Sequence, residues 1–241
     1  MLLQTRGIIL RAIPFNDVNA IIHVYTESFG RVAYLSARRR GKRTSVSKAL
    51  YMPFSALEME VEHKPKRELQ RIRETRPAFT QVDTFRNPIK NILALFIAEI
   101  IYRIIRNTEP DKALSNFLFH SAEALELTDK GLANYHIAFL SQLPTYLGFR
   151  PNFDGYTPNS CFDLAEGNLT SYPSARPNCL SIADTQTMHR LLKINYRNMG
   201  IYSFSRKDRI NIIEKTLLYY HHHQPDFGKI KSLDILQTLF N

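Results

Sequence analysis

Alternating hydrophobic and polar positions mark the first 75 residues of the chain. Residues 5–13, 20–26 and 31–36 are short runs of β-branched and aromatic side chains separated by turn residues. Residues 56–62 (ALEMEVE) alternate apolar and acidic side chains, as a half-buried strand does, and residues 69–73 are expected to return as a fifth strand. The pattern predicts a small five-stranded barrel, and an SH3-like barrel or a plain sandwich fits it nearly as well.

After Pro77 the spacing of apolar positions changes from two to three and four, which predicts helices. The expected helices cover residues 89–106, 113–127, 132–147, 184–195, 206–223 and 232–240. Asp111 and Ser232 are expected to cap the helices that follow them. The segment between residues 148 and 181 is rich in turn residues and is expected to be mostly loop.

These patterns predict an α+β chain with two domains. A five-stranded barrel would cover residues 1–80, and a helical domain would cover residues 81–241 with an irregular insert at about 148–182. A chain of 241 residues with 44% hydrophobic residues has enough apolar material for a core without metal or disulfide support.

Positive charge is concentrated in the predicted barrel. The whole chain carries a net charge of +10, and residues 1–80 hold 15 Lys and Arg against 7 Asp and Glu. The remainder is nearly balanced, with 17 basic and 15 acidic residues. Such an asymmetry is typical of a module that faces a polyanion, although a basic surface also serves solubility or attraction to membranes.

A cytoplasmic location is expected for this chain. The two cysteines, Cys161 and Cys179, cannot form a disulfide framework, and no secretory signal is visible at the start. The longest apolar stretch, at residues 92–105, is interrupted by Glu99 and Arg103 and is too short to span a bilayer.

The strongest local feature is a basic run directly after the third predicted strand. Its cations are Arg38, Arg39, Arg40, Lys42 and Arg43, with Lys48 beyond them. Crowded cations repel one another, and phosphates that neutralise them release counterions, so the run predicts contacts to a nucleic-acid backbone. The alternative is a solvated loop without a partner.

A second basic cluster lies around the last predicted hairpin. It consists of Lys64, Lys66, Arg67, Arg71 and Arg73, and Arg71 and Arg73 share strand parity, so they are expected on one face. Arg11 is expected to support these cations. Most aromatic residues of the module are expected in the core, but Phe15 and Tyr51 lie near turns and are candidates for stacking on bases.

The sequence contains no recognisable enzyme signature. Carboxylates do not cluster as metal ligands, and no glycine-rich phosphate loop occurs. The three consecutive histidines at 221–223 would point about 100° apart on a helix, so they cannot converge on one ion. No metal site and no cofactor are predicted.

Several segments resemble the RecO family of bacterial recombination mediators. The residues that carry the resemblance are Gly7–Arg11, Asp17, His23–Glu27, Gly30–Val32, Met52–Glu60, Leu147–Asn152 and Lys231–Leu233. The resemblance implies an OB-fold followed by a helical domain. Many relatives carry two cysteine pairs of zinc-ribbon type in the insert, whereas this chain has only Cys161 and Cys179 there. The insert is therefore expected to fold without zinc, around Phe153, Phe162, Leu164 and Leu169.

The function implied by the resemblance is that of a non-enzymatic DNA repair and recombination mediator. Such a protein binds single- and double-stranded DNA, anneals complementary strands and helps to load recombinase onto strands coated by single-stranded-DNA-binding protein. The implied partners are RecR and the C-terminal tail of the single-stranded-DNA-binding protein, and the implied location is the nucleoid. An RNA-binding barrel protein is the first alternative, and a nucleic-acid hydrolase is the second.

Overall fold

A computed structural model describes residues 2–16, 19–37, 50–106, 109–171 and 177–238. The chain forms two compact units, Met1–Leu127 with Ile230–Leu236, and Thr128–Lys229 with Gln237–Asn241. The predicted boundary at residue 80 falls inside the first unit, because three helices pack in the same unit as the barrel. No helix in the described part of the chain is both long and apolar enough to cross a membrane.

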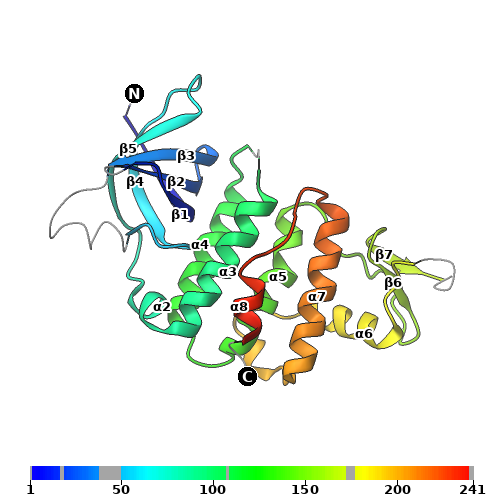
Figure 1. Cartoon of the computed structure of the whole chain (residues 1–241). Helices are drawn as coiled ribbons and strands as arrows, with labels where there is room; N and C mark the ends of the chain where they lie inside the picture. Colours follow the sequence, from blue (N-terminus) through cyan, green and yellow to red (C-terminus); the bar gives the residue numbers. More distant parts are fainter. Residues whose placement is uncertain (1, 17–18, 38–49, 107–108, 172–176, 239–241) are drawn as a thin grey trace. The chain divides into compact units, whose positions relative to one another are not determined.

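The first unit begins with a closed five-stranded barrel (Figure 1). Its strands are β1 (Leu2–Pro14), β2 (Asn19–Thr26), β3 (Gly30–Ala37), β4 (Ala56–Glu62) and β5 (Leu69–Pro77). The order is β1-β2-β3-β5-β4, and the barrel closes because β1 pairs with both β2 and β4 while β3 runs parallel to β5. This is the OB-fold, so the predicted barrel is confirmed and the sandwich alternative is wrong.

Alternate residues of each strand fill the barrel. The buried cluster contains Ile9, Ile22, Val24, Val32, Tyr34, Leu57, Met59 and Val61. Gly7 has neighbours on both sides of β1, and a Cβ atom there would lie 2.5 Å from Cγ1 of Val24. Only glycine fits at that position without movement of the core.

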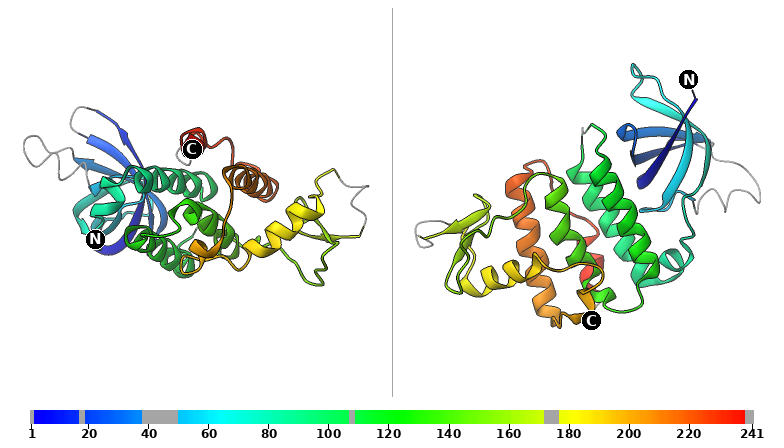
Figure 2. Two further views of the ribbon diagram at one scale, coloured as in Figure 1. Left: turned by 90° about the horizontal axis from the view of Figure 1, so that it is seen from below. Right: turned by 180° about the vertical axis from the view of Figure 1, so that it is seen from behind.

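Three helices, α2 (Val82–Arg86), α3 (Pro88–Ile104) and α4 (Lys112–Leu127), complete the first unit together with the first residues of α8 (Leu233–Thr238), whose last two residues belong to the second unit. The two long helices, α3 and α4, lie side by side in both views of Figure 2. The predicted cap of α4 is confirmed, because Oδ1 of Asp111 accepts hydrogen bonds from the backbone N–H groups of Ala113 and Leu114. The Asn87 side chain caps α3 in the same way.

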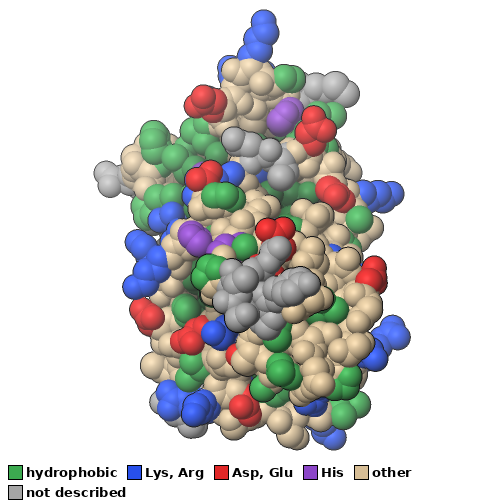
Figure 3. Space-filling model, turned by 90° about the vertical axis from the view of Figure 1, so that its right-hand side faces the viewer, with side chains coloured by type: hydrophobic (Ala, Val, Ile, Leu, Met, Phe, Trp, Pro, Cys, Tyr) green, Lys and Arg blue, Asp and Glu red, His purple; other side chains and the backbone are tan. Residues whose placement is uncertain are grey.

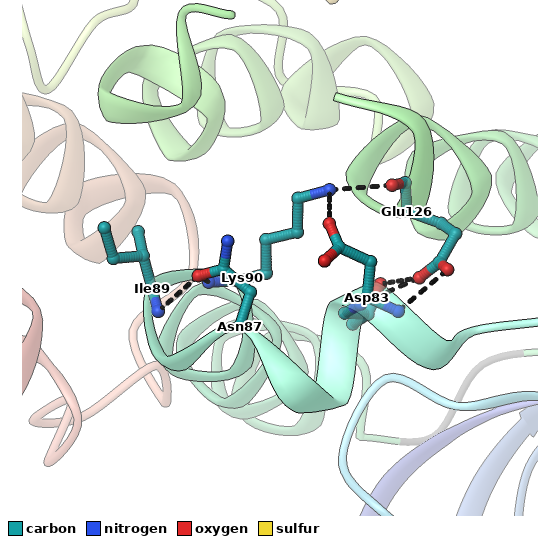
Figure 4. A network of polar contacts seen from close by, with 6 residues as sticks. Asp83, Asn87, Ile89, Lys90 and Glu126 are labelled. Carbon is teal, nitrogen blue, oxygen red and sulfur yellow. Dashed lines mark hydrogen bonds and ion pairs between the residues drawn. The ribbon is translucent and has the colours of Figure 1, made fainter. Parts of the chain in front are cut away.

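A buried lysine joins the starts of α2 and α3 to the end of α4 (Figure 4). Lys90 is 2% exposed, and its Nζ atom contacts the Asp83 carboxylate and donates to the backbone oxygen of Glu126 at 2.7 Å. The Glu126 carboxylate accepts from the N–H groups of Asp83 and Thr84 at 2.9 and 2.8 Å, which satisfies the open end of α2.

The second unit is mostly helical. Its elements are η1 (Leu132–Asn134), α5 (Tyr135–Tyr146), β6 (Cys161–Asp163), β7 (Asn168–Thr170), α6 (Ile182–Leu191), η3 (Met199–Ile201) and α7 (Arg206–His223). A capping box formed by Ser205 and Asp208 opens α7. Tyr220 in α7 donates a hydrogen bond to the backbone oxygen of Leu140 in α5 at 2.6 Å, so the hydroxyl of this buried ring is satisfied.

The insert contains a short hairpin where mostly loop is predicted. β6 and β7 have three residues each, too few for an alternating pattern to be visible in the sequence. The rings of Phe153 and Phe162 stack with centroids 4.6 Å apart, and Phe162 and Leu164 are buried. Phe153, Phe162 and Leu164 of the predicted apolar cluster are therefore buried, whereas Leu169 is half-buried.

Candidate nucleic-acid interface

The outer face of β1, β2 and β3 presents two aligned rows of side chains. Because Ile22 and Tyr34 point into the barrel, the residues on either side of each point outward. One row aligns Arg11 with His23 and Ala33. The next row aligns Ile13, Ile21 and Leu35, and the parallel pairing of β3 with β5 ends that row at Arg71.

The end of α3 adds further cations to this outer face. His23, Arg31, Ala33, Tyr102, Arg103 and Arg106 line one open pocket of about 500 Å³. No carboxylate belongs to this lining, as far as the structure describes the chain. With the neighbouring Arg11 and Arg71, these residues form what we call the barrel face.

Arg31 fixes the end of α3 against the barrel. Its Nη1 atom donates to the backbone oxygens of Tyr102 and Ile105 at 2.8 and 2.7 Å. The last carbonyls of a helix have no partner within the helix and carry partial negative charge, so a guanidinium suits this position. Burial lowers the pKa of Arg31, whose charge is nevertheless satisfied by these two oxygens.

Tyr102 is surrounded by the cations of this pocket. The guanidinium carbons of Arg31 and Arg11 lie 4.1 and 5.5 Å from its ring centroid. The His23 ring meets it edge-on with centroids 5.2 Å apart. These contacts hold the positive groups close together through cation–π attraction.

The surroundings of His23 favour the neutral form of its ring. Burial lowers the pKa of His23, and the neighbouring Arg31 and Arg11 lower that pKa further. A bound anion would offset the charges of both arginines and favour the protonated ring. Binding of an anion in this pocket would therefore be accompanied by uptake of a proton by His23.

The positive charge of Arg103 is less available to an anion than the charges of its neighbours. It forms an ion pair with Glu99 at 2.9 Å. Burial alone would raise the pKa of Glu99, but hydrogen bonds from Lys231, Ser232 and Arg103 outweigh it, so the pKa is lowered. Glu99 thus stays ionised and neutralises part of this edge of the face.

The loop between β4 and β5 displays Lys64, Lys66 and Arg67, all of them exposed. The side chain of buried Gln70 holds this loop: its Nε2 atom donates to the backbone oxygens of Lys64 and Arg67, and its Oε1 atom accepts from the N–H of Lys64. In OB-folds this loop and the face of strands 2 and 3 are where oligonucleotides bind. The hydrogen bonds from buried Gln70 therefore hold the backbone of this loop in place against the barrel.

The predicted cluster around the last hairpin is not electrostatically uniform. Arg73 and Lys64 pair with Glu62 at 2.6 and 3.2 Å, and these two cations, Arg73 first, lower the pKa of Glu62 to about 2. Arg71 and Lys66 form no ion pair within the described residues. Arg73 is the extra residue of a bulge in β5, so its placement does not follow from simple strand alternation.

The two candidate stacking residues occupy different surroundings. Phe15 is 58% exposed beside the turn between β1 and β2. Tyr51 is half-buried against the barrel core, and its hydroxyl accepts a hydrogen bond from Ser36 at 2.9 Å. This placement favours Phe15 over Tyr51 as a ring that a base can reach.

The basic run of Arg38, Arg39, Arg40, Lys42 and Arg43 lies outside the described residues. It directly follows β3, one of the strands of the barrel face. The sequence pattern does not single out Arg31, Tyr102 or Arg106, because Arg31 is one polar position in a predicted strand and residues 89–106 are predicted only as a helix. The available signal was the pair Arg103 and Arg106 at the end of that helix, three residues apart.

No group of three or more His, Cys, Asp or Glu side chains in the described residues is arranged to hold a metal ion. Cys161 is buried, and Cys179 lies across a β-bridge from Asp163, whose Oδ1 atom is already engaged by two backbone N–H groups. His223, the last of the three consecutive histidines, stacks on Phe149 and contacts the backbone oxygen of Leu164. These donor sets do not fit a tetrahedral zinc site.

Charge is mixed on other parts of the surface. On the face drawn in Figure 3, Lys and Arg side chains stand among Asp and Glu side chains, without one continuous basic patch.

Comparison with known proteins agrees with this architecture. The family description "Recombination protein O N terminal" matches residues 1–80, and "Recombination protein O C terminal" matches residues 86–234. Proteins named DNA repair protein RecO are similar over the full length of both chains. They include those of Azobacteroides pseudotrichonymphae (37% identical over 241 residues), Bacteroides fragilis (33% over 244) and Porphyromonas gingivalis (34% over 247). The chain belongs to the RecO family of DNA repair and recombination proteins, which are recombination mediators and not enzymes.

Proposed function

We propose that this chain binds single- and double-stranded DNA, anneals complementary strands and helps to load recombinase onto strands coated by single-stranded-DNA-binding protein. The observation that carries the proposal is the barrel face, where Arg11 and Arg31 lie over the ring of Tyr102 and Arg106 lines the same pocket as Tyr102, whose described lining contains no carboxylate. Membership of a DNA repair family supports DNA as the ligand.

The chemistry of the barrel face favours the DNA backbone over the bases. Arg11, Arg71 and Arg106 are exposed and suited to phosphates, whereas the ring of Tyr102 is already engaged by two guanidinium groups. Contacts to phosphates carry affinity but no sequence information. Such a face accepts single strands and duplexes of any sequence.

Annealing follows from the same electrostatics. Two complementary strands repel each other through their phosphates, and cations that neutralise both strands lower this repulsion. The five cations of the basic run after β3 are part of this proposal, together with Arg73 and the loop cations Lys64 and Lys66. No step requires a metal ion or a reacting side chain, because pairing is driven by the bases themselves.

Two protein partners belong to the proposal. We propose that RecR and the acidic, apolar C-terminal tail of the single-stranded-DNA-binding protein bind this chain, and that it associates with the nucleoid. Family membership supports these partners. Immobilised tail peptide should retain the chain, and a peptide lacking its terminal acidic residues should not.

We also propose that the insert folds without metal. The stacked pair Phe153 and Phe162 and the buried Leu164 supply an apolar centre there. Treatment of the purified chain with a chelator should then leave its melting temperature unchanged, and a stoichiometric zinc content would contradict this.

Annealing of two dye-labelled complementary oligonucleotides tests the proposed function directly. A variant with Arg11→Ala and Arg71→Ala should anneal them more slowly, because both unpaired cations of the barrel face are lost. The matched control is Arg6→Ala with Arg76→Ala, which removes the same charge from cations already paired with Glu27 and Glu58. Equal rates in the two variants would overturn the assignment, and preferential pairing of RNA strands would favour the RNA alternative.

A further inference from the structure

The second unit carries a cationic surface of its own at the end of α6. His189, Arg190, Lys193, Asn198, Ile201 and Tyr202 line an open pocket of about 390 Å³. Together with the exposed Arg197, we call this the α6 surface. No carboxylate belongs to the described lining of the pocket.

Backbone turns after α6 bring these side chains together. The Asn195 side chain accepts from the N–H of Arg197 at 2.9 Å, and the Asn198 side chain donates to the backbone oxygen of Lys193 at 2.8 Å. Buried Asn134 donates to the backbone oxygens of Met199 and Tyr202. The surface is therefore formed by a fixed stretch of chain.

The cations of the α6 surface are available to a ligand. Arg190, Lys193 and Arg197 are exposed, and none of them forms an ion pair in the part of the chain that the structure describes. By contrast, Arg206 and Arg209, which continue the basic pattern, donate to the backbone oxygens of Gln237 and Phe204. Gathering three unpaired cations is unfavourable unless an anion neutralises them.

Apolar groups stand beside these cations. Ile201 is 80% exposed, and the rings of Tyr202 and Phe204 lie with centroids 5.7 Å apart. Surfaces that bind single-stranded nucleic acid combine cations for the phosphates with rings and apolar side chains for unstacked bases. The α6 surface has both components.

We propose that the α6 surface binds a second single strand of DNA. This inference rests on the proposed function, since annealing requires one protein to hold two strands. The barrel face holds the first strand, and Arg190, Lys193 and Arg197 contact the phosphates of the second. Tyr202 and Ile201 contact its bases.

The test measures capture of a second strand by the full chain. Donor- and acceptor-labelled oligothymidylates, which cannot pair with each other, are added to the protein, and energy transfer reports two strands on one complex. The test variant carries Arg190→Ala, Lys193→Ala and Arg197→Ala. The charge-matched control carries Lys130→Ala, Arg150→Ala and Lys229→Ala, which are exposed residues of the same unit.

The test variant should bind the first strand as the unaltered chain does but lose energy transfer and annealing, while the control keeps both. At excess DNA its salt slope should be shallower by about 2.1, from three contacts of about 0.7 each. Unchanged energy transfer in the test variant would overturn the proposal. So would a test variant that loses only binding of an acidic peptide, because the surface would then serve a protein partner.

Failure of the proposed function gives a different result. In that case the unaltered chain binds no strand, or the Arg11 and Arg71 variant binds as well as the unaltered chain. A melting temperature equal to that of the unaltered chain confirms that the test variant is folded. Lys193→Glu serves as a second variant, because reversal of one exposed charge should reduce second-strand capture without removal of apolar contacts.

Discussion

Arg31 shows how one side chain serves both the fold and the candidate interface. Its guanidinium caps the last turn of α3, stacks on Tyr102 and lies in the same pocket as Arg106. None of these roles is visible in the sequence, where Arg31 is one polar position in an alternating strand. Its partners lie more than 70 residues away, so only the folded chain reveals them.

We expect DNA binding to depend on pH through His23. In the free protein its pKa is lowered by burial and then by Arg31 and Arg11, and bound phosphate should raise it again. Binding therefore takes up a proton, and affinity for DNA should rise as pH falls from about 7 to about 5. The measurement is DNA affinity across this range for the unaltered chain and for His23→Gln, whose pH dependence should be weaker.

The lowered pKa of His23 also affects the free energy of unfolding, which should fall as pH falls, whereas DNA affinity should rise. Because the pKa of His23 is lower in the folded chain than in the unfolded chain, the unfolded chain binds more protons in acid. Its contribution to the free energy of unfolding is thus lost as pH falls below about 6.5. Identical pH profiles of His23→Gln and the unaltered chain in both measurements would contradict this account.

The contributions of Lys90 and Asp83 to the free energy of unfolding are expected to be strongly coupled. Asp83→Ala should lower the free energy of unfolding by about 1–3 kcal/mol, because it leaves the buried ammonium with fewer partners. In a Lys90→Met background the same change should cost little, since Asp83 is half-exposed and water can solvate it. Urea denaturation of the four chains measures this, and an equal cost in both backgrounds would refute the coupling.

At the scale of elements, strand and helix patterns account for most of the fold. The five strands of the barrel were predictable because each alternates, and α3, α4 and α7 were predictable from their apolar spacing. The rows of the barrel face were not, because they depend on strand register and on the bulges in β1 and β5. The hairpin of β6 and β7 is too short to carry a pattern.

The conformation of the β4–β5 loop is expected to depend on the buried side-chain amide of Gln70. Gln70→Leu keeps a side chain of similar size in the barrel but removes the hydrogen bonds that hold the backbone of Lys64 and Arg67. We expect DNA affinity to fall by about fivefold, which corresponds to about 1 kcal/mol, the usual net contribution of one hydrogen bond. Fluorescence anisotropy measures the affinity for DNA. A heteronuclear NMR spectrum of the backbone amides of the β4–β5 loop should show whether the loop loses its ordered conformation. Unaltered affinity would mean that the loop does not contact DNA.

At the scale of the whole chain, the barrel is electrically two-sided. On the β1, β4 and β5 side, Arg6 and Arg76 are paired with Glu27 and Glu58, and Glu60 lies directly opposite Glu74. On the barrel face, Arg11 and Arg31 have aromatic and carbonyl partners instead, and Arg103 is the cation that pairs with a carboxylate, that of Glu99. Among the described residues of the barrel, the cations without an ion pair therefore lie on the barrel face and in the β4–β5 loop.

The salt dependence of single-stranded DNA binding tests the central claim most directly. Fluorescence anisotropy is measured across a salt series for the unaltered chain, for Arg11→Ala with Arg71→Ala, and for the matched control Arg6→Ala with Arg76→Ala. Each phosphate contact contributes about 0.7 to the slope of log affinity against log salt, so the first variant should lose about 1.4. The control should keep the slope, and replacing the five cations of the basic run by alanine should remove up to about 3.5. Equal slopes in the barrel-face variant and the control would contradict the assignment of this face to DNA.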